Sequence, residues 1–392
     1  MATITKQPIL AATAFMDRSN QNSQLVGAQA LVQIGSNLYA GLAGNSSPSF
    51  AVFKSTDGGK TWAQKDAAHA PALAGFPIYE VIAAQDGIYY VWYGDGASVA
   101  SQAIGYCRFD PVTDTWGAVH ASPVIASNTA FLAIARRSNG DIVVLFTSQL
   151  PLANDVQFGI FPRSTGLWGG ANNFFNTVSG ISNPVAAVVG PDNTVYALTQ
   201  DGAGPTQIFF QTISPSNVVS AQALIATIGA GEIAPGLPVI WNGQLIFPFT
   251  ALGGGSPSMF VGTPLPAPVW TNVALALVTP LADVNTPIAF VTPQNALLMF
   301  VTLNGSIAAP PYQLWFSTFG TSALVPPSGK TLYYDAVANP PAAGPVDEIL
   351  KVSVIPFSGS IAGMVGMQLT PGFPPENAYF LLPGCVPNAQ GN

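Results

Sequence analysis

The acidic side chains are the residues of this sequence best suited to acid–base chemistry. There are 18 Asp and Glu residues but only 2 His among the 392 residues. Cleavage of a glycosidic bond uses two carboxyl groups that lie about 5–10 Å apart. Because 18 carboxyl groups make some close pair inevitable, the positions of the acids in the fold must decide which of them can act together.

Other common reactive arrangements are missing from the sequence. Two histidines cannot supply a three-His metal site, and there is no His-Glu-x-x-His pattern. There is also no calcium-binding loop, no complete phosphate-binding loop and no Gly-x-Ser-x-Gly nucleophile elbow. We therefore expect no metal, no cofactor and no histidine-activated nucleophile.

The segment KSTDGGKTW combines Ser55, Asp57, Gly59, Thr61 and Trp62 at the spacing Ser-x-Asp-x-Gly-x-x-Thr-Trp. Asp followed by Gly favours a tight turn, because Gly accepts positive φ and the Asp carboxylate can bind nearby backbone amides. The two hydroxyl groups can bind further turn amides, and the indole can cover the turn. We therefore predict that these five residues close a β-hairpin and do not contact a ligand.

This spacing resembles the Asp box of sialidases and other BNR-repeat β-propellers. In that family the box closes the hairpin between the third and fourth strands of a blade, away from the face that binds ligands. The segment FDPVTDTW, Phe109 to Trp116, resembles a kelch repeat, and RSTGLW, Arg163 to Trp168, resembles a degenerate Asp box. The resemblance implies a β-propeller fold.

Sialidase activity is not expected, although the resemblance raises it. Sialidases grip a carboxylate with three arginines, and every arginine of this chain precedes residue 164: Arg18, Arg108, Arg136, Arg137 and Arg163. An arginine triad drawn from blades all around a ring cannot be built from this set. Arg136 and Arg137 fall in a hairpin turn, where we expect both to be exposed to solvent.

A hairpin pattern repeats along the chain. Its first apolar residues after the turn are Leu38, Ile88, Ile142, Val195, Leu245, Leu297 and Ile361, which are spaced by 50, 54, 53, 50, 52 and 64 residues. A third apolar run follows each hairpin, and a Trp marks several fourth runs. Four strands per repeat of about 50 residues predict an all-β fold, a seven-bladed β-propeller of four-stranded antiparallel blades.

We expect a single propeller domain over residues 1–392. The predicted blades span 31–71, 79–123, 131–177, 184–229, 236–280, 285–341 and 344–383. Only ten residues follow the last predicted strand, and their prolines disfavour another strand. Because an unpaired outer edge invites association, we predict that residues 8–15 pair with the last blade and close the ring.

Position in a propeller selects the ligand-binding candidates. Ligands usually meet the loops that join strand four to the next strand one, and strand two to strand three. The predicted candidates in or beside these loops are Glu80, Tyr93, Asp95, His120, Asp201 and Asp347. Glu80 is expected near the start of an inner strand, close to the pore, and Asp347 is the best partner for it if the protein is an enzyme.

An aromatic run supports sugar recognition by part of this set. The segment IYYVWYGDGAS places Tyr93 two residues before Asp95, and Asp201 falls in the same kind of loop two blades later. An aromatic face beside a carboxylate suits a sugar ring, whose C–H face stacks and whose hydroxyl groups form hydrogen bonds. Repeated turn chemistry explains the same pattern equally well.

Composition excludes several classes of function. Charged residues make up 7%, the net charge is −7 and the pI is about 4.6, which argues against nucleic acid or an anionic membrane as a partner. Mean hydropathy is +0.38, yet no run of 18 apolar residues predicts a membrane-spanning helix. Cys107 and Cys385 are too few for a disulfide framework.

The first 20 residues make a poor signal peptide, so we expect cytoplasmic synthesis, with later release or assembly left open.

Three functions remain open. The main prediction is a non-catalytic recognition or scaffold protein that binds a neutral glycan or a protein partner through its loop face. The first alternative is a structural subunit of a virion or an extracellular assembly. The second is a glycoside hydrolase or lyase with an acid pair at the pore. Because the sialidase arginines are missing, an enzyme is the less favoured prediction.

Overall fold

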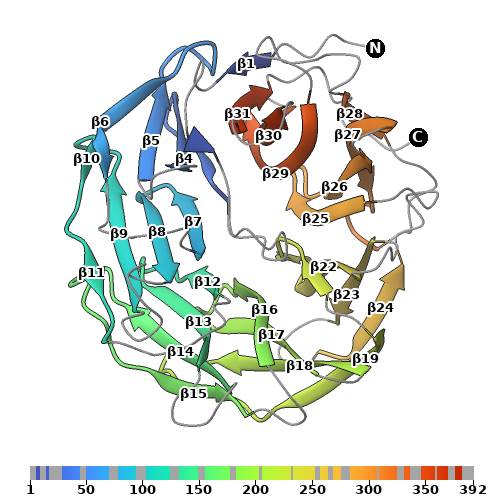
Figure 1. The fold of residues 1–392 in the computed structure, drawn as a ribbon. Coiled ribbons are helices and arrows are strands. Elements are labelled where there is room, and N and C mark those ends of the chain that lie inside the picture. Colours follow the sequence, from blue (N-terminus) through green and yellow to red (C-terminus); the bar gives the residue numbers. More distant parts are fainter. Residues whose placement is uncertain are drawn as a thin grey trace.

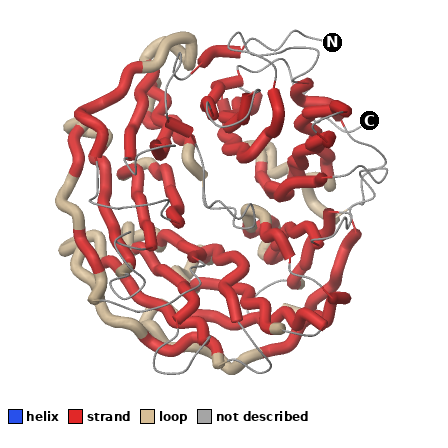
Figure 2. Tube along the Cα trace, in the orientation of Figure 1, coloured by secondary structure: helices blue, strands red, loops and turns tan. Residues whose placement is uncertain are grey.

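The computed structural model describes residues 6–8, 15–16, 29–44, 50–69, 78–93, 103–123, 132–148, 155–176, 182–202, 205–230, 233–251, 257–263, 268–274, 283–306, 309–324, 331–335, 346–357, 360–369 and 376–381. These residues form strands, turns and loops without a helix (Figure 2). Accordingly, no helix of the described part is long and apolar enough to cross a membrane. The strands are arranged as a ring of sheets (Figure 1).

The described strands group into seven sheets. The first four are β2 (Phe15–Met16) with β3 (Leu31–Ile34), β4 (Asn37–Gly44), β5 (Phe50–Ser55) and β6 (Ala63–His69); β7 (Ile78–Ala84), β8 (Gly87–Tyr93), β9 (Ile104–Asp110), β10 (Thr115–Trp116) and β11 (His120–Ala121); β12 (Leu132–Arg136), β13 (Ile142–Ser148), β14 (Asp155–Phe161) and β15 (Asn172–Phe175); and β16 (Ser182–Val189), β17 (Val195–Asp201), β18 (Pro205–Ile213) and β19 (Ala223–Ala230).

The remaining sheets come from the second half of the chain. They are β20 (Ile233–Pro235), β21 (Val239–Trp241), β22 (Gln244–Ala251), β23 (Pro257–Gly262) and β24 (Trp270–Ala274); β25 (Asp283–Val291), β26 (Leu297–Ser306), β27 (Ala309–Thr318) and β28 (Thr331–Asp335); and β29 (Val346–Phe357), β30 (Ser360–Leu369) and β31 (Glu376–Leu381) with β1 (Lys6–Pro8).

Within each sheet the strands are antiparallel, and they follow the chain outward, as in β12-β13-β14-β15, except that β1 is the outermost strand of the last sheet. The first strands, such as β7, β12, β16, β25 and β29, lie toward the centre of the ring, and the last strands lie toward its outside (Figure 1). Leu237 and Ile288, from neighbouring sheets, form a parallel bridge near this centre. The fold is a β-propeller of four-stranded antiparallel blades, as the repeat predicts.

The hairpin turns lie where the repeat places them. Each apolar residue used to define the repeat is the first or second residue of its strand, in β4, β8, β13, β17, β22, β26 and β30. Between β21 and β22, Asn242 and Gly243 both have positive φ, 50° and 74°. This pair forms the tight kind of turn whose twist matches two antiparallel strands.

The hydrophobic core lies between neighbouring sheets. Phe50 of β5 stacks on Tyr90 of β8, with ring centroids 4.5 Å apart, and both side chains are buried. The same cluster extends to Ile355 of β29 and Ala362 of β30, on the other side of the first sheet. Burial against two neighbours explains why the strands read as nearly continuous apolar runs.

The N-terminal segment joins the two ends of the ring. Lys6 pairs with Leu381 and Pro8 with Tyr379, so that β1 is the outer strand of the last sheet. The predicted range 8–15 was wrong in its bounds: the pairing strand is Lys6–Pro8, whereas Phe15 and Met16 pair with β4 of the first sheet. The segment therefore contacts both the last sheet and the first.

Candidate functional site

A cavity of about 320 Å³ lies among the inner strands β7, β12 and β16. Most of its wall is apolar and comes from Leu132–Ala135, Val185–Val189 and the pair Leu237 and Pro238. Three polar side chains interrupt this wall: Gln29, Glu80 and Arg136. Ligand pockets typically measure about 300–1,000 Å³ and combine apolar walls with a few placed polar groups.

Glu80 places a carboxylate in this cavity. It is the third residue of β7 and is only 1% exposed. Ile82 and Ala84 line the cavity with it, because alternate residues of a strand point to the same side. A carboxylate is almost never so buried without a partner, and Glu80 does have an interaction within the protein. A buried acid therefore lies at the centre of the ring.

Gln29 precedes β3 and reaches the same cavity. Its main-chain oxygen accepts a hydrogen bond from the Ala83 amide at 2.6 Å. Its side-chain Nε2 donates to the main-chain oxygens of Leu31 at 3.1 Å and Val354 at 2.5 Å. These bonds tie together β3, β7 and β29. No sequence pattern indicated Gln29, because it is a single polar residue in the apolar stretch LVGAQALV and belongs to no motif.

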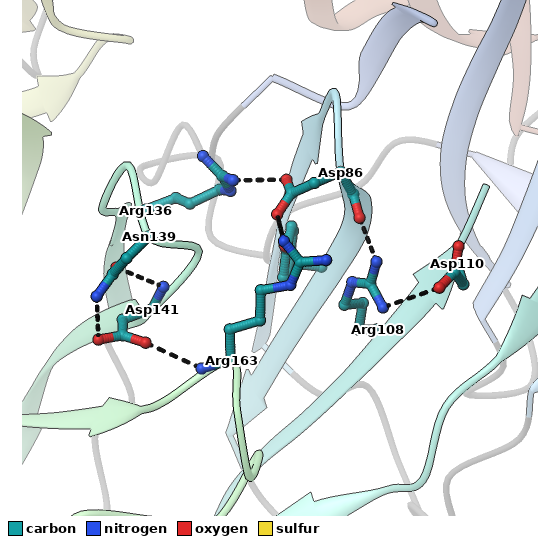
Figure 3. Close-up of polar contacts among 8 residues, drawn as sticks. Asp86, Arg108, Asp110, Arg136, Asn139, Asp141 and Arg163 are labelled. Atoms are coloured by element: carbon teal, nitrogen blue, oxygen red, sulfur yellow. Dashed lines mark hydrogen bonds and ion pairs between the residues drawn. The ribbon is translucent and has the colours of Figure 1, made fainter. Parts of the chain in front are cut away.

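Arg136 provides the cation of the cavity wall. It is the last residue of β12, and its Nη2 lies 2.6 Å from Oδ1 of Asp86, in the turn between β7 and β8 (Figure 3). The guanidinium also lies over the ring of Tyr89, 5.6 Å from the ring centroid. Because successive inner strands of a propeller run the same way, Glu80 and Arg136 lie toward opposite ends of the cavity.

Asp86 and Arg136 each favour the charged form of the other. Burial alone would raise the pKa of Asp86, but the hydrogen bond from Tyr89 Oη at 2.6 Å and the ion pair with Arg136 outweigh it, so the pKa is lowered. Burial alone would lower the pKa of Arg136, but its bonds to Asp86 and Tyr89 raise it. Asp86 is therefore ionised at neutral pH, and it compensates the charge of Arg136.

The remaining contacts in Figure 3 extend this ion pair into a network between two sheets. Arg163 Nη1 lies 2.5 Å from Asp86 Oδ2, and the Arg163 amide donates to Asp141 Oδ1 at 3.0 Å. Arg108 donates to the main-chain oxygen of Asp86 and forms an ion pair with Asp110 at 3.2 Å. The network joins the sheet of β7–β11 to that of β12–β15.

Arg137 shows that the predicted exposure of the two adjacent arginines was wrong. Arg137 is 4% exposed, and it inserts into the β18–β19 turn of the next sheet. There it donates to the main-chain oxygen of Ser214 at 2.8 Å and to Asn217 Oδ1 at 2.9 Å. Arg136 is also only 21% exposed at its side chain. The turn between β12 and β13, which contains Arg137, packs on the neighbouring sheet. The sequence repeat gave no indication of this contact.

The predicted ligand-binding candidates do not all meet. Glu80 is the one that lines the cavity among those whose side chains the structure describes. Asp201, the last residue of β17, is completely buried and has an interaction of its own. Tyr93 ends β8 and Asp347 is the second residue of β29, and only the backbone of each is described. Asp95 lies outside the described residues.

His120 lies on the outer side of its sheet, although the repeat placed it in a loop between blades. It belongs to β11 and pairs with Tyr106 of β9. Its ring lies 6.2 Å from the Tyr106 ring and packs against Gly166 of the next sheet, where an added Cβ would come within 2.5 Å of Nε2. In the described part of the chain, no group of three or more His, Cys, Asp or Glu is placed to hold a metal ion.

Asp57 organises the turn between β5 and β6. Its Oδ1 accepts hydrogen bonds from the amides of Lys60 at 3.0 Å and Thr61 at 2.9 Å, and from the Ser55 hydroxyl at 2.8 Å. The Thr61 hydroxyl donates to Oδ2 at 2.6 Å. These bonds, led by those from Thr61, hold the pKa of Asp57 well below its usual range. The carboxylate is thus occupied by its own turn.

Comparison with solved structures finds similar folds at low sequence identity. An ulvan lyase of polysaccharide lyase family PL25, bound to -[GlcA(1-4)Rha3S]-, is 10% identical with a TM-score of 0.62, and the match covers 96% of this chain and 95% of that one. The α-L-arabinanase of Penicillium chrysogenum, complexed with arabinobiose, is 13% identical with a TM-score of 0.51 over 96% and 98%. No protein-family model and no curated protein matches the chain.

These similarities correct the main functional prediction. From the sequence we predicted a non-catalytic recognition or scaffold protein, with a glycan-cleaving enzyme as a less favoured alternative. The two structural neighbours described above are a polysaccharide lyase and a glycoside hydrolase, and they favour the enzyme alternative over that prediction. That prediction relied on the missing sialidase arginines, which argue against sialidase chemistry but not against other ways of cleaving a glycan. The Asp box and kelch resemblances find no matching family model.

Proposed function

We propose that the protein is a glycan-cleaving enzyme, a glycoside hydrolase whose site is the central cavity. The observation that carries this proposal is Glu80, a carboxylate 1% exposed in the wall of a cavity of about 320 Å³. An ionisable side chain buried in a cleft is a candidate for proton transfer in catalysis. The likeness to a hydrolase and a lyase of glycans supports the same class of substrate.

Asp347 is the proposed second carboxyl group. Hydrolysis of a glycosidic bond needs one group that protonates the leaving oxygen and another that activates water or attacks the anomeric carbon. Asp347 is the second residue of β29, and Glu80 is the third residue of β7. Because both are inner strands that run the same way, both positions fall at the same end of the ring. This placement makes Asp347 a better partner for Glu80 than an acid of an outer strand.

A polysaccharide lyase is the second candidate, since the ulvan lyase has the higher TM-score of the two neighbours reported above. Lyases of uronate-containing glycans must bind a substrate carboxylate, for which a cation with free donors is the natural partner. The cation of this cavity, Arg136, is already paired with Asp86 at 2.6 Å. Because Asp86 compensates its charge, Arg136 binds a substrate carboxylate less strongly than an arginine without a counter-ion would, and this favours a hydrolase.

The test is a screen of the purified protein against neutral and uronate-containing polysaccharides. Two products are measured in parallel: new reducing ends, which both reactions release, and the ultraviolet absorbance of unsaturated uronates, which only a lyase produces. We expect new reducing ends without unsaturated products. Unsaturated products would establish the lyase instead, and no cleavage of any substrate would refute a glycan-cleaving enzyme.

Matched variants locate the activity. Glu80→Gln keeps the size of the side chain and removes its acid function, so it should abolish cleavage. Asp192→Asn changes an exposed acid in the turn before β17 and should leave cleavage unchanged. Equal activity in both variants would move the site away from the central cavity.

We also propose how the sheets correspond to blades and which turn is an Asp box. We assign each of the seven sheets to one blade, with β1 completing the last of them, which the strand pairing supports. We further propose that the segment Lys54–Trp62 is a true Asp box, supported by the hydrogen bonds of Asp57 within its turn. A crystal structure that resolves the connecting loops would test both assignments.

A further inference from the structure

The side-chain amide of Gln29 has its two donors fully used. Nε2 carries two hydrogens, and one is directed to the main-chain oxygen of Leu31 and the other to that of Val354. Both partners are carbonyl oxygens, which only accept hydrogen bonds. They therefore fix the orientation of the amide, since a flipped amide would place its oxygen against two other oxygens.

The amide oxygen of Gln29 is the atom left over. Among the residues that the structure describes, it accepts no hydrogen bond, and Gln29 lines the central cavity. An amide oxygen offers two acceptor positions and no donor. The polar group that Gln29 offers to the cavity is thus a pure acceptor.

The position of this acceptor is fixed by strands on three sides. The main-chain oxygen of Gln29 is bound to Ala83 of β7, and the amide of Ala30 donates to Ser353 Oγ of β29 at 3.1 Å. Ala30 is completely buried, and Ser353 is 1% exposed. A group held this firmly loses little freedom when a ligand binds, which is the condition for a strong contribution to affinity and specificity.

We propose that Gln29 is a substrate-binding residue, and that its amide oxygen accepts a hydrogen bond from a hydroxyl group of a neutral sugar. Glu80 lines the same cavity and is a second acceptor while ionised. Two acceptors suit a ligand rich in hydroxyl donors, whereas a uronate carboxylate or a sulfate offers further acceptors and is repelled. This inference rests on the proposed function and narrows its substrate to neutral glycans.

Two complementary substitutions separate binding from structure. Gln29→Lys keeps donors for Leu31 and Val354 and removes the acceptor, so stability should be kept while sugar affinity falls. Gln29→Glu keeps an acceptor and removes the donors, so the protein should be less stable while the folded fraction still binds. If Gln29 had a purely structural role, a variant would bind sugar more weakly only where it is also less stable. Gln85→Lys is the control for the added charge, since Gln85 donates to Gln33 on an exposed turn.

Arabinobiose is the neutral probe and digalacturonic acid is its anionic counterpart, and titration calorimetry measures both. We expect the wild-type protein to prefer arabinobiose and Gln29→Lys to bind it about tenfold more weakly, the effect of one lost hydrogen bond. Gln85→Lys should bind as the wild type does. In the polysaccharide screen, Gln29→Lys should raise KM with little change in kcat.

Unchanged affinity in Gln29→Lys, or a preference for digalacturonic acid, would overturn the inference. So would a wild-type protein that binds neither disaccharide. After any of these outcomes, the polysaccharide screen would still test the proposed function. If the wild-type protein cleaves a polysaccharide and Glu80→Gln does not, the proposed function holds although Gln29 does not bind substrate. A screen without any cleavage would remove the proposed function, and with it the catalytic context of Gln29.

Discussion

Arg136 and Asp86 form an ion pair across the boundary between two sheets, with Nη2 and Oδ1 2.6 Å apart. Asp86 belongs to the turn between β7 and β8, and Arg136 ends the inner strand of the next sheet. Tyr89 and Arg163 contact the same carboxylate. One acid therefore holds an arginine in the wall of the central cavity and fastens two blades to each other.

Asp86→Asn should lower the free energy of unfolding by about 1–3 kcal/mol, because the substitution leaves two arginines without their counter-charge at a partly buried site. Chemical denaturation measures the change. Asp192→Asn is the control. Asp192 lies in an exposed turn, so this substitution should change the free energy of unfolding by no more than about 0.5 kcal/mol. Equal effects of the two variants would show that Asp86 contributes nothing specific.

The contribution of Asp86 should disappear in acid. Its folded-state pKa is lowered from the ordinary value. Its stabilisation is therefore complete above the unfolded-state pKa of about 3.9 and is lost as the pH falls through the lower folded-state value. The difference in unfolding free energy between wild type and Asp86→Asn should be constant from neutral pH to about pH 5 and should narrow below about pH 4. A difference that stays constant into acid would contradict the lowered pKa.

Asp57→Ala should lower the melting temperature without affecting glycan cleavage. The substitution leaves the Lys60 and Thr61 amides of the β5–β6 turn without their acceptor. Thermal unfolding followed by circular dichroism gives the first quantity, and the polysaccharide screen gives the second. Loss of cleavage at unchanged stability would mean that this turn serves function directly.

Deletion of residues 1–17 should destabilise the ring and promote association. It removes β1 from the edge of β31 and β2 from β4. An exposed edge strand is a template for pairing with another chain, so light scattering should increase as the melting temperature falls. A melting curve identical to that of the full-length protein would show that closure does not depend on this segment.

The acid pair should behave as one catalytic unit. Glu80→Gln and Asp347→Asn should each lower kcat by about 10²–10⁴, the range for the loss of general acid–base catalysis. The double variant should be little slower than the slower single variant, because residues that act as a unit have non-additive effects. If the two reductions multiply, the two acids act independently and Asp347 is not the partner of Glu80.

Local chemistry explains which features the sequence could predict. Asn242 and Gly243 form their turn without help from distant residues, and the Asp57 turn satisfies itself within a few residues. The repeat and the order of the strands could be predicted for the same reason, because each hairpin joins strands that are adjacent in the sequence. Arg137 was assigned to solvent because its partners, Ser214 and Asn217, lie in the next sheet.

The site was less predictable because its parts come from separate blades. Glu80 could be placed near the centre from its position in the repeat. Gln29 could not, because its role depends on Val354 and Ala83, which the fold brings to it from two other sheets. The prediction of a non-catalytic protein failed for a related reason. It compared the chain with a single catalytic apparatus, whereas the fold only determines where reactive groups can meet.

The pairing of Lys6 with Leu381 has a consequence for biosynthesis. Because β1 is translated long before β31, it must wait without this partner until β31 has been translated. Loop-closure entropy opposes a contact between residues so distant in sequence, although the cost grows only slowly with length. Every nascent chain therefore passes through a stage in which the earlier blades exist and the last sheet still lacks its outer strand. A ribosome that stops before β31 releases a chain that cannot form this pairing, so the ring can close only after β31 has been translated.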